Sequence, residues 1–187
     1  MDMNANFTER TEVIALKNQY EILGDHTLVH MRCGKACTIS TSTLDIVKPY
    51  NWCVEGTGYI MSRSGGKPIK MHRLILSAPK GIYVDHIDGN PLNNTIENLR
   101  MCRKQQNEFN TKIRMDNSSG YKGVSFSKSK RLYRAYINRD GKQYFLGYFL
   151  TKEEAAVAYN EAAVVLFGEF ARLNQILNPD LVSVSAQ

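Results

Sequence analysis

The chain has 187 residues, of which 43% are hydrophobic and 22% charged. This composition is typical of a folded protein with a real core, and it excludes the collagen-like and disordered classes. Apolar runs stay far below the roughly 18 residues that a membrane span needs. The polar N-terminus MDMNANFTER lacks the apolar stretch of a signal peptide. We therefore expect a soluble cytoplasmic protein with no membrane partner.

The net charge of +6 is unevenly distributed. Residues 67–117 and 118–174 each hold nine basic and five acidic side chains, whereas residues 1–66 hold six basic and seven acidic ones. A basic excess gathered in one part of a chain favours a polyanionic partner such as a nucleic acid. All of the basic excess therefore lies between residues 67 and 174.

The first segment, residues 1–66, contains short β-prone runs separated by glycine-containing turns. These runs read EVIAL, HTLVHM, CTIST and GYIMS, and such spacing predicts a small β-rich unit. Trp52 is expected to anchor its core. The role of this unit stays open between core, DNA contact and dimerisation.

The second segment, residues 67–116, has mixed character. KMHRLILSA predicts a short helix, GIYVDH a strand, DGNPLNN a polar loop, NLRMC a second strand and RKQQNEFNTKIRM a helix. The expected order is therefore strand, loop, strand, helix.

The third segment, residues 117–174, predicts three strands and a helix. Its strands would be GVSFS, LYRAYINR and YFLGYF, with the hairpin signal Asp140-Gly141 between the last two. Thr151 with Glu154 forms a capping-box pattern that opens an alanine-rich helix, which Gly168 can end. Residues 175–187 form a tail without a pattern. The whole chain is predicted to be an α+β protein.

Polar residues that can do chemistry concentrate in the second segment. They are His72, Asp85, His86, Asp88, Asn90, Asn93, Asn94, Asn98 and Asn107. Turn propensity alone would explain DGNPLNN, because Asp, Gly and Asn accept left-handed backbone and cap their own turns. The conjunction of an Asp-His pair at a strand end with asparagines on the following strand and helix favours a chemical site.

This arrangement resembles the HNH nuclease family, through HRLIL, VDHIDGNPLNN, ENLR and KQQN over about 40 residues without a gap. The resemblance implies a ββα-metal unit that hydrolyses DNA phosphodiester bonds, leaving 5′-phosphate and 3′-hydroxyl ends. It also implies a homing-type endonuclease of the kind found in phages and introns.

The resemblance assigns roles to five residues. His86 would be the general base, because a neutral imidazole accepts a proton near neutral pH. Asp85 and Asn107 would hold one divalent ion per active site, Mg²⁺ or Mn²⁺, through oxygen atoms. Asn98 would orient the loop and the base, and His72 would support the site or contact phosphate. Because neighbouring strand residues face opposite sides, the first strand should end or bulge at Asp85-His86.

The third segment resembles the Apetala-type DNA-binding domain of plant ethylene-response factors, through YKGV, RAYI, YFLGYF, TKEEAAVAYNEAA and the closing LN. The resemblance implies a three-stranded sheet in the major groove of double-stranded DNA, with the helix behind. Ser125, Ser127 and Phe145 stand where that family has arginine or tryptophan, so its target site does not carry over. The candidate DNA contacts are Lys122, Ser125, Ser127, Lys128, Lys130, Arg131, Arg134, Tyr136, Asn138, Gln143 and Phe145.

Two alternatives stay open. A non-catalytic DNA-binding regulator would keep the motif as a scaffold, and an RNA-directed protein would prefer structured RNA. One active centre cuts one strand, so a double-strand break would need a homodimer or two sequential events.

The four cysteines contain no CxxC pair, and we expect reduced thiols and no structural zinc. A zinc site would need His26 and His30 to join Cys33 and Cys37 as ligands of one ion. In a strand the two histidines are about 13 Å apart, which is too far for a shared tetrahedral ion.

Overall fold

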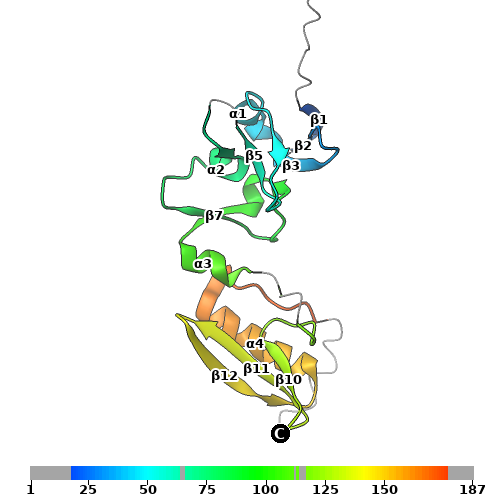
Figure 1. Ribbon diagram of the computed structural model, residues 1–187, viewed down its shortest axis with the longest axis vertical. Coiled ribbons are helices and arrows are strands. Elements are labelled where there is room, and N and C mark those ends of the chain that lie inside the picture. The colour runs from blue at the N-terminus through cyan, green and yellow to red at the C-terminus, as the bar shows by residue number, and fades with distance from the viewer. Residues whose placement is uncertain (1–17, 64–65, 112, 114–116, 177–187) are drawn as a thin grey trace, which may run out of the picture.

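The computed structural model describes residues 18–63, 66–111, 113 and 117–176. One lobe holds the elements up to the last strand before helix α3 (Lys104–Phe109), and the other holds the remaining strands and helix α4 (Lys152–Phe167); α3 lies between them (Figure 1). The structure is a mixture of helix and sheet, as expected for an α+β protein. No helix in the described ranges is long and apolar enough to cross a membrane.

The first lobe begins with an antiparallel sheet of β1 (Gln19–Leu23), β2 (His26–His30) and β3 (Ala36–Ser40). This confirms strands in HTLVHM and CTIST, while the run EVIAL lies outside the described residues. A fourth strand, β8 (Asn93–Asn94), pairs in parallel with β3. The asparagine-rich loop is therefore attached to the N-terminal sheet.

A second small sheet and three short helical turns complete the N-terminal part. The sheet has the antiparallel order β4 (Cys53–Val54), β5 (Ile60–Ser62) and β6 (Ile69–Lys70). The turns are η1 (Thr41–Thr43), α1 (Leu44–Val47) and α2 (Met71–Ile75), the last confirming the helix expected in KMHRLILSA.

One hydrophobic core runs through this lobe. Trp52 is buried and its indole Nε1 donates to the Val47 carbonyl at 2.9 Å, as expected of a core anchor. The same cluster contains Val29, Ile39, Ile60, Met71, Val84 and Leu99. Sequence texture changes at residue 66, but the buried core continues across that position.

The strand, loop, strand, helix order is confirmed. Strand β7 (Tyr83–His86) pairs antiparallel with β9 (Leu99–Cys102), the turn η3 (Ile96–Asn98) precedes β9, and α3 follows it. Helix α3 is shorter than the expected RKQQNEFNTKIRM, because its last turn ends at Asn110, whose side chain bonds back to β7.

The second lobe has the predicted three strands and helix: β10 (Val124–Ser127), β11 (Leu132–Arg139), β12 (Lys142–Phe149) and α4. Both turn residues of the β11–β12 hairpin have positive φ, 54° at Asp140 and 72° at Gly141, as a tight hairpin turn requires. Thr151 and Glu154 form the expected capping box. Helix α4 ends at Gly168, where the turn η4 (Gly168–Phe170) begins.

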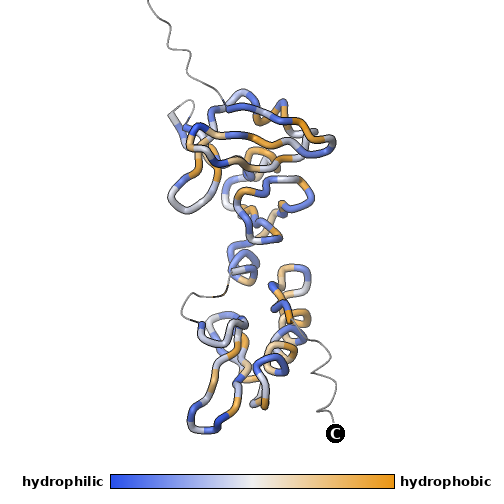
Figure 2. The backbone as a smooth tube through the Cα atoms, turned by 90° about the vertical axis from the view of Figure 1, so that its right-hand side faces the viewer, coloured by the Kyte–Doolittle hydropathy of each residue, from blue (hydrophilic) through white to orange (hydrophobic). Residues whose placement is uncertain are grey.

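Sheet and helix form two layers in this lobe (Figure 2). Ala135 and Ile137 of β11 are buried against α4, as strand alternation predicted. Gly123 has φ +74, and a Cβ there would collide with the Tyr159 ring and the Tyr136 carbonyl oxygen. The glycine of YKGV thus allows β10 to approach both the helix and β11.

Candidate active site

The loop between β7 and β9 is organised around the carboxylate of Asp88. It accepts hydrogen bonds from the Asn90 backbone N–H at 2.7 Å and from the side-chain amides of Asn93 and Asn98, both at 2.9 Å. Burial opposes the charged form, but these bonds outweigh it and lower the Asp88 pKa. Asp88 therefore holds the loop as an ionised acceptor.

Asn98 closes the loop from the other end. Its Oδ1 accepts from the Asp88 backbone N–H at 3.0 Å, and its Nδ2 also donates to the Asn93 carbonyl at 2.8 Å. The side chain is buried, so the bonds are shielded from water. This is the geometry that an orienting role requires.

His86 ends strand β7 and is 4% exposed. Its Nε2 lies 3.3 Å from Oδ1 of Asn94, while Nδ2 of Asn94 donates to the Pro91 carbonyl at 3.0 Å. Because Nδ2 is engaged as a donor, Oδ1 accepts from His86, and Nε2 must carry the proton. Nδ1, which makes no hydrogen bond within the described residues, is left as the basic nitrogen.

The surroundings keep this imidazole neutral. Burial lowers the His86 pKa, although the Asn94 hydrogen bond and the charges of Asp88 and Asp85 act in the opposite direction. The rings of Tyr59 and His72 lie 5.8 Å and 5.1 Å from that of His86. A neutral imidazole at neutral pH is competent as a proton acceptor.

His72 supports the site from α2. Burial, followed by the charges of His86, Lys70 and Arg73, lowers its pKa to about 3. The ring stands edge-on to His86 with an interplanar angle of 73°, and its buried Nδ1 has no hydrogen-bond partner among the described residues. This placement suits a packing contact with His86 better than a contact with phosphate.

Asp85 faces a different set of neighbours. Its Oδ2 accepts from Arg100 Nη2 at 2.7 Å and Nε at 3.0 Å, and Asn110 Nδ2 lies 3.0 Å from each carboxylate oxygen. The same amide donates to the His86 carbonyl at 2.8 Å. The strand keeps regular pairing through Asp85 and His86 and then ends, so the expected strand end is found, without a bulge.

The structure brings Asn110, and not Asn107, into contact with Asp85. Asn107 lies half-buried on α3, and its side chain makes no hydrogen bond with a described residue; its backbone N–H donates to Arg103. Sequence reasoning named Asn94 among the polar candidates without giving it a role, and it missed Arg100 and Asn110. The signals were present: Asn110 follows Asn107 by one turn, and Arg100 stands where antiparallel pairing would oppose it to Asp85.

One carboxylate oxygen of Asp85 stays available to a hard divalent ion. Oδ2 takes three hydrogen bonds, whereas Oδ1 takes one from Asn110 and keeps a lone pair. In the part of the chain that the structure describes, no three His, Cys, Asp or Glu side chains gather as a metal site. An ion here would rest on one carboxylate and an amide oxygen and keep most of its waters, which is the habit of Mg²⁺.

The second lobe presents an open sheet face on the side away from α4. The pairs Ser125↔Arg134, Tyr136↔Phe145 and Asn138↔Gln143 place these side chains together. Directly opposed residues of an antiparallel pair share a face. The open face is Ser125, Ser127, Arg134, Tyr136, Asn138, Gln143, Phe145 and Tyr148.

Tyr148 joins this face because the pairing shifts. Ala135 opposes Gly147 but Tyr136 opposes Phe145, so Leu146 is an extra residue. The bulge brings the Tyr148 ring 5.0 Å from that of Phe145. Sequence reasoning missed Tyr148; a glycine inside a strand was the available signal for a bulge.

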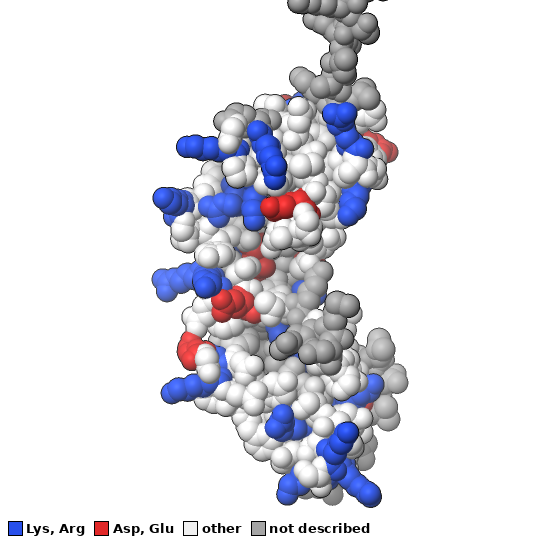
Figure 3. All heavy atoms as spheres, viewed as in Figure 1, with Lys and Arg blue, Asp and Glu red and all other residues white. Residues whose placement is uncertain are grey.

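Basic residues surround one end of the open face. Lys128, Lys130 and Arg131 are exposed in the β10–β11 turn, and Arg131 has φ +54. Figure 3 shows lysine and arginine side chains at the end of this lobe that lies away from the first lobe.

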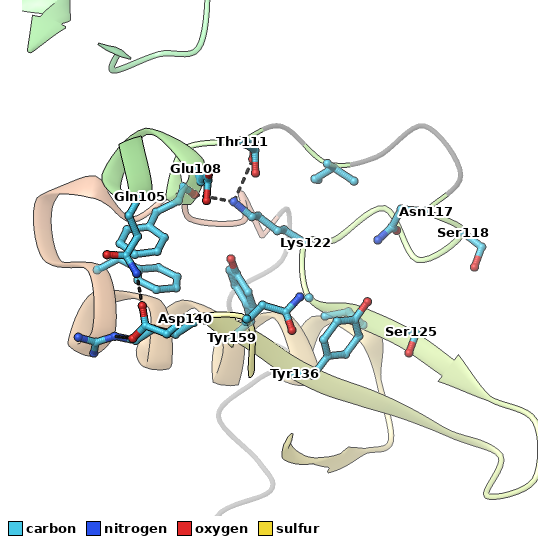
Figure 4. Close-up of a pocket in the computed structure, with 18 residues that line it drawn as sticks. Gln105, Glu108, Thr111, Asn117, Ser118, Lys122, Ser125, Tyr136, Asp140 and Tyr159 are labelled. Atoms are coloured by element: carbon cyan, nitrogen blue, oxygen red, sulfur yellow. Dashed lines mark hydrogen bonds and ion pairs between the residues drawn. The ribbon is translucent and has the colours of Figure 1, made fainter. Parts of the chain in front are cut away.

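Lys122 does not belong to this face. Its ammonium donates to the carbonyl of Phe109, the last residue of α3, at 2.6 Å and to that of Thr111 at 2.9 Å (Figure 4). Burial, and then the charge of Arg172, lowers its pKa to about 8. Two of its three N–H donors are therefore engaged at the end of α3, where Lys122 joins the second lobe to this helix.

Comparison with known proteins decides the family. The chain is 39% identical over 156 residues to an uncharacterized HNH endonuclease of Acanthamoeba polyphaga mimivirus, which covers 80% of each chain. A family model described as HNH endonuclease matches residues 77–109. The chain belongs to the HNH endonuclease family. The matched stretch runs from the turn after α2 to the end of α3.

Two further relatives come from a phage and a prophage. Protein 3.8 of Escherichia phage T7 is 42% identical over 94 residues, half of this chain and 77% of its own length. The SPbeta prophage protein YosQ of Bacillus subtilis, which carries the name of an HNH homing endonuclease, is 37% identical over 81 residues, 41% of this chain and 46% of its own. No solved structure matches the chain significantly.

Proposed function

We propose that this HNH protein is a metal-dependent, homing-type DNA endonuclease that hydrolyses phosphodiester bonds of double-stranded DNA to 5′-phosphate and 3′-hydroxyl ends. The observation that carries the proposal is the buried His86, whose Nε2 is held by Asn94 at 3.3 Å. It lies beside the loop that the ionised Asp88 carboxylate organises. Such a preset tautomer serves proton transfer and has no evident use in a DNA-binding scaffold.

In the proposed reaction, Nδ1 of His86 takes a proton from the attacking water. The imidazolium that forms is stabilised because Asn94 Oδ1 accepts the Nε2 proton and Asp88 and Asp85 supply nearby negative charge. Asn98 and Asp88 keep the loop rigid, so that the ring does not have to reorganise during the step.

Asp85, through Oδ1, and Asn107 would hold one divalent ion, Mg²⁺ or Mn²⁺. When bound, the ion supplies the positive charge that stabilises the leaving 3′ oxygen. Arg100 keeps Oδ2 occupied, so Oδ1 is the carboxylate oxygen that would be available to the ion.

The second lobe would read DNA as an Apetala-type domain, with its open face in the major groove. Arg134, Lys128 and Lys130 would hold phosphates, and Asn138 and Gln143 would contact base edges. Phe145 and Tyr148 add an aromatic surface that can pack on sugars and thymine methyl groups.

A monomer with one centre would nick one strand. A double-strand break would then require a homodimer or two sequential events. The protein would act in the cytoplasm of a host cell.

Cleavage of supercoiled plasmid tests the proposal. With Mg²⁺ or Mn²⁺ the purified protein should relax or linearise the plasmid, and a chelator should stop it. Binding to varied DNAs without metal-dependent cleavage would overturn the proposal in favour of a regulator. Stronger competition by structured RNA than by duplex DNA would assign the site to RNA. Mapping cut sites on host and phage genomes would then identify the recognition sequence.

A further inference from the structure

Arg100 contacts both lobes at once. On β9 it lies directly opposite Asp85, and its Nε and Nη2 donate to Oδ2 of that carboxylate at 3.0 and 2.7 Å. On its other side, Nη1 donates to the Glu169 carbonyl, and the guanidinium carbon stands 4.3 Å from the Phe170 ring centroid. Both latter groups belong to η4, at the end of α4.

Other contacts hold η4 in this position. The rings of Phe109 and Phe167 stack with centroids 3.9 Å apart, which joins α3 to the end of α4. The Lys122 ammonium binds two carbonyls at the C-terminal end of α3, and Gln105 of α3 donates to Asp140 of the β11–β12 hairpin (Figure 4). The second lobe is therefore docked on α3 by groups that are independent of Arg100.

The position of this guanidinium decides how Asp85 is presented. A planar guanidinium makes its hydrogen bonds in a rigid fork, so its orientation is transmitted to the carboxylate it binds. Here the fork occupies Oδ2 and leaves Oδ1 with Asn110 alone. Removing the η4 contact would let Arg100, and with it the carboxylate, adopt other orientations.

We propose that Arg100 is a positioning residue through which the second lobe sets the orientation of Asp85. Docking of η4 on the guanidinium holds the carboxylate in the form that receives the divalent ion. Glu169 lies 69 residues after Arg100 in the sequence. Through this contact the DNA-reading lobe takes part in the nuclease site. The catalytic consequence rests on the proposed endonuclease function, whereas the link between Asp85 and η4 does not.

The catalytic consequence is tested by plasmid cleavage as a function of Mg²⁺ concentration. Phe170→Ala should raise the half-saturating Mg²⁺ concentration by about three- to ten-fold, with KM for DNA unchanged. Arg100→Lys, which keeps the charge but loses the fork, should raise it at least as much. Phe126→Ala removes an exposed phenylalanine of β10 that does not line the open face, and should leave the dependence unchanged. Wild-type Mg²⁺ dependence in both Phe170→Ala and Arg100→Lys would overturn the catalytic role.

The link itself is tested without metal or DNA, by equilibrium unfolding of single and double variants. Phe170→Ala and Asp85→Asn should be coupled by about three-fold or more in the unfolding equilibrium constant. The coupling should vanish when both are made in an Arg100→Ala background. Independent effects in the wild-type background, or coupling that survives Arg100→Ala, would overturn the inference. A wild type that never cleaves would refute the proposed function but leave this measurement interpretable.

Discussion

The nuclease site and the open sheet face place their side chains in opposite environments. Asp85, His86 and Asn94 are at most 6% exposed. The His86 ring bonds to the Asn94 side chain, and the His86 carbonyl accepts from another buried side chain. On the open face, Phe145 and Tyr148 are 57% and 43% exposed and stand on strands whose stability comes from the opposite side. The two regions carry their functions under different constraints.

Burial couples function to stability in the first region. A polar group that loses its partner inside a protein costs free energy, so each site residue also supports the fold. An exposed side chain pays no such cost and can be exchanged. We therefore expect the open face to tolerate substitutions that alter DNA recognition, whereas substitutions in the nuclease site should affect activity and stability together.

The largest effect is expected from His86→Ala. Loss of the proton acceptor should lower cleavage by roughly 10²–10⁴-fold, while DNA binding persists because the open face is untouched. Plasmid nicking and gel-shift measurements check the two parts. His26→Ala, which removes an exposed histidine of β2, is the matched control and should cleave as the wild type. Full cleavage by His86→Ala would remove it from the catalytic role.

On the open face, Asn138→Ala should weaken binding to the cognate site by about ten- to hundred-fold, as loss of a base contact does. Its unfolding free energy should stay within about 0.5 kcal/mol of the wild type. Lys130→Ala should instead weaken binding to all sequences alike and reduce the salt dependence, because a phosphate contact carries no sequence information. Fluorescence anisotropy at several salt concentrations distinguishes the two. Equal losses on cognate and random DNA for Asn138→Ala would contradict base reading.

Asn98→Ala tests the loop. It removes side-chain bonds to Asp88 and Asn93 and should destabilise the protein by about 2–4 kcal/mol, since buried partners are left unsatisfied. Urea unfolding measures the change. Asn51→Ala, at an exposed asparagine, should change stability by less than about 0.5 kcal/mol. Similar stabilities for the two variants would mean that the loop does not depend on Asn98.

The last effect is a pH dependence of stability. His72 has a pKa of about 3 in the folded protein, below its unfolded value of 6.5, so the unfolded chain binds the extra proton between those values. Stability is therefore fully present above pH 6.5 and should fall by about 1.4 kcal/mol per pH unit below it from this residue. His72→Phe should flatten the curve between pH 6.5 and 5, as unfolding at each pH would show. An unchanged slope would mean that His72 is protonated in the fold.

Much of the fold followed from local pattern. The capping box at Thr151, the Asp140-Gly141 hairpin and the alternation of Ala135 and Ile137 each depend on neighbours within a few residues. The strand, loop, strand, helix order around Asp85 and His86 was likewise readable, since turn asparagines and short apolar runs mark its boundaries. The end of α3 could not be predicted from the sequence, because it depends on hydrogen bonds from the Asn110 side chain to a strand 25 residues earlier.

The sequence by itself determined the strand, loop, strand, helix order, the three strands and helix of the second lobe, and the resemblance to HNH nucleases, because these depend on residue types at short spacing. Only the tertiary structure decided which partners those residues meet. Asn94 reaches His86 because β8 joins the N-terminal sheet, and Arg100 lies between Asp85 and Phe170 because the second lobe docks on α3. A bulge at Leu146 turned Tyr148 outward. Such contacts depend on how distant segments pack to bury apolar surface, and local propensity carries no record of that packing.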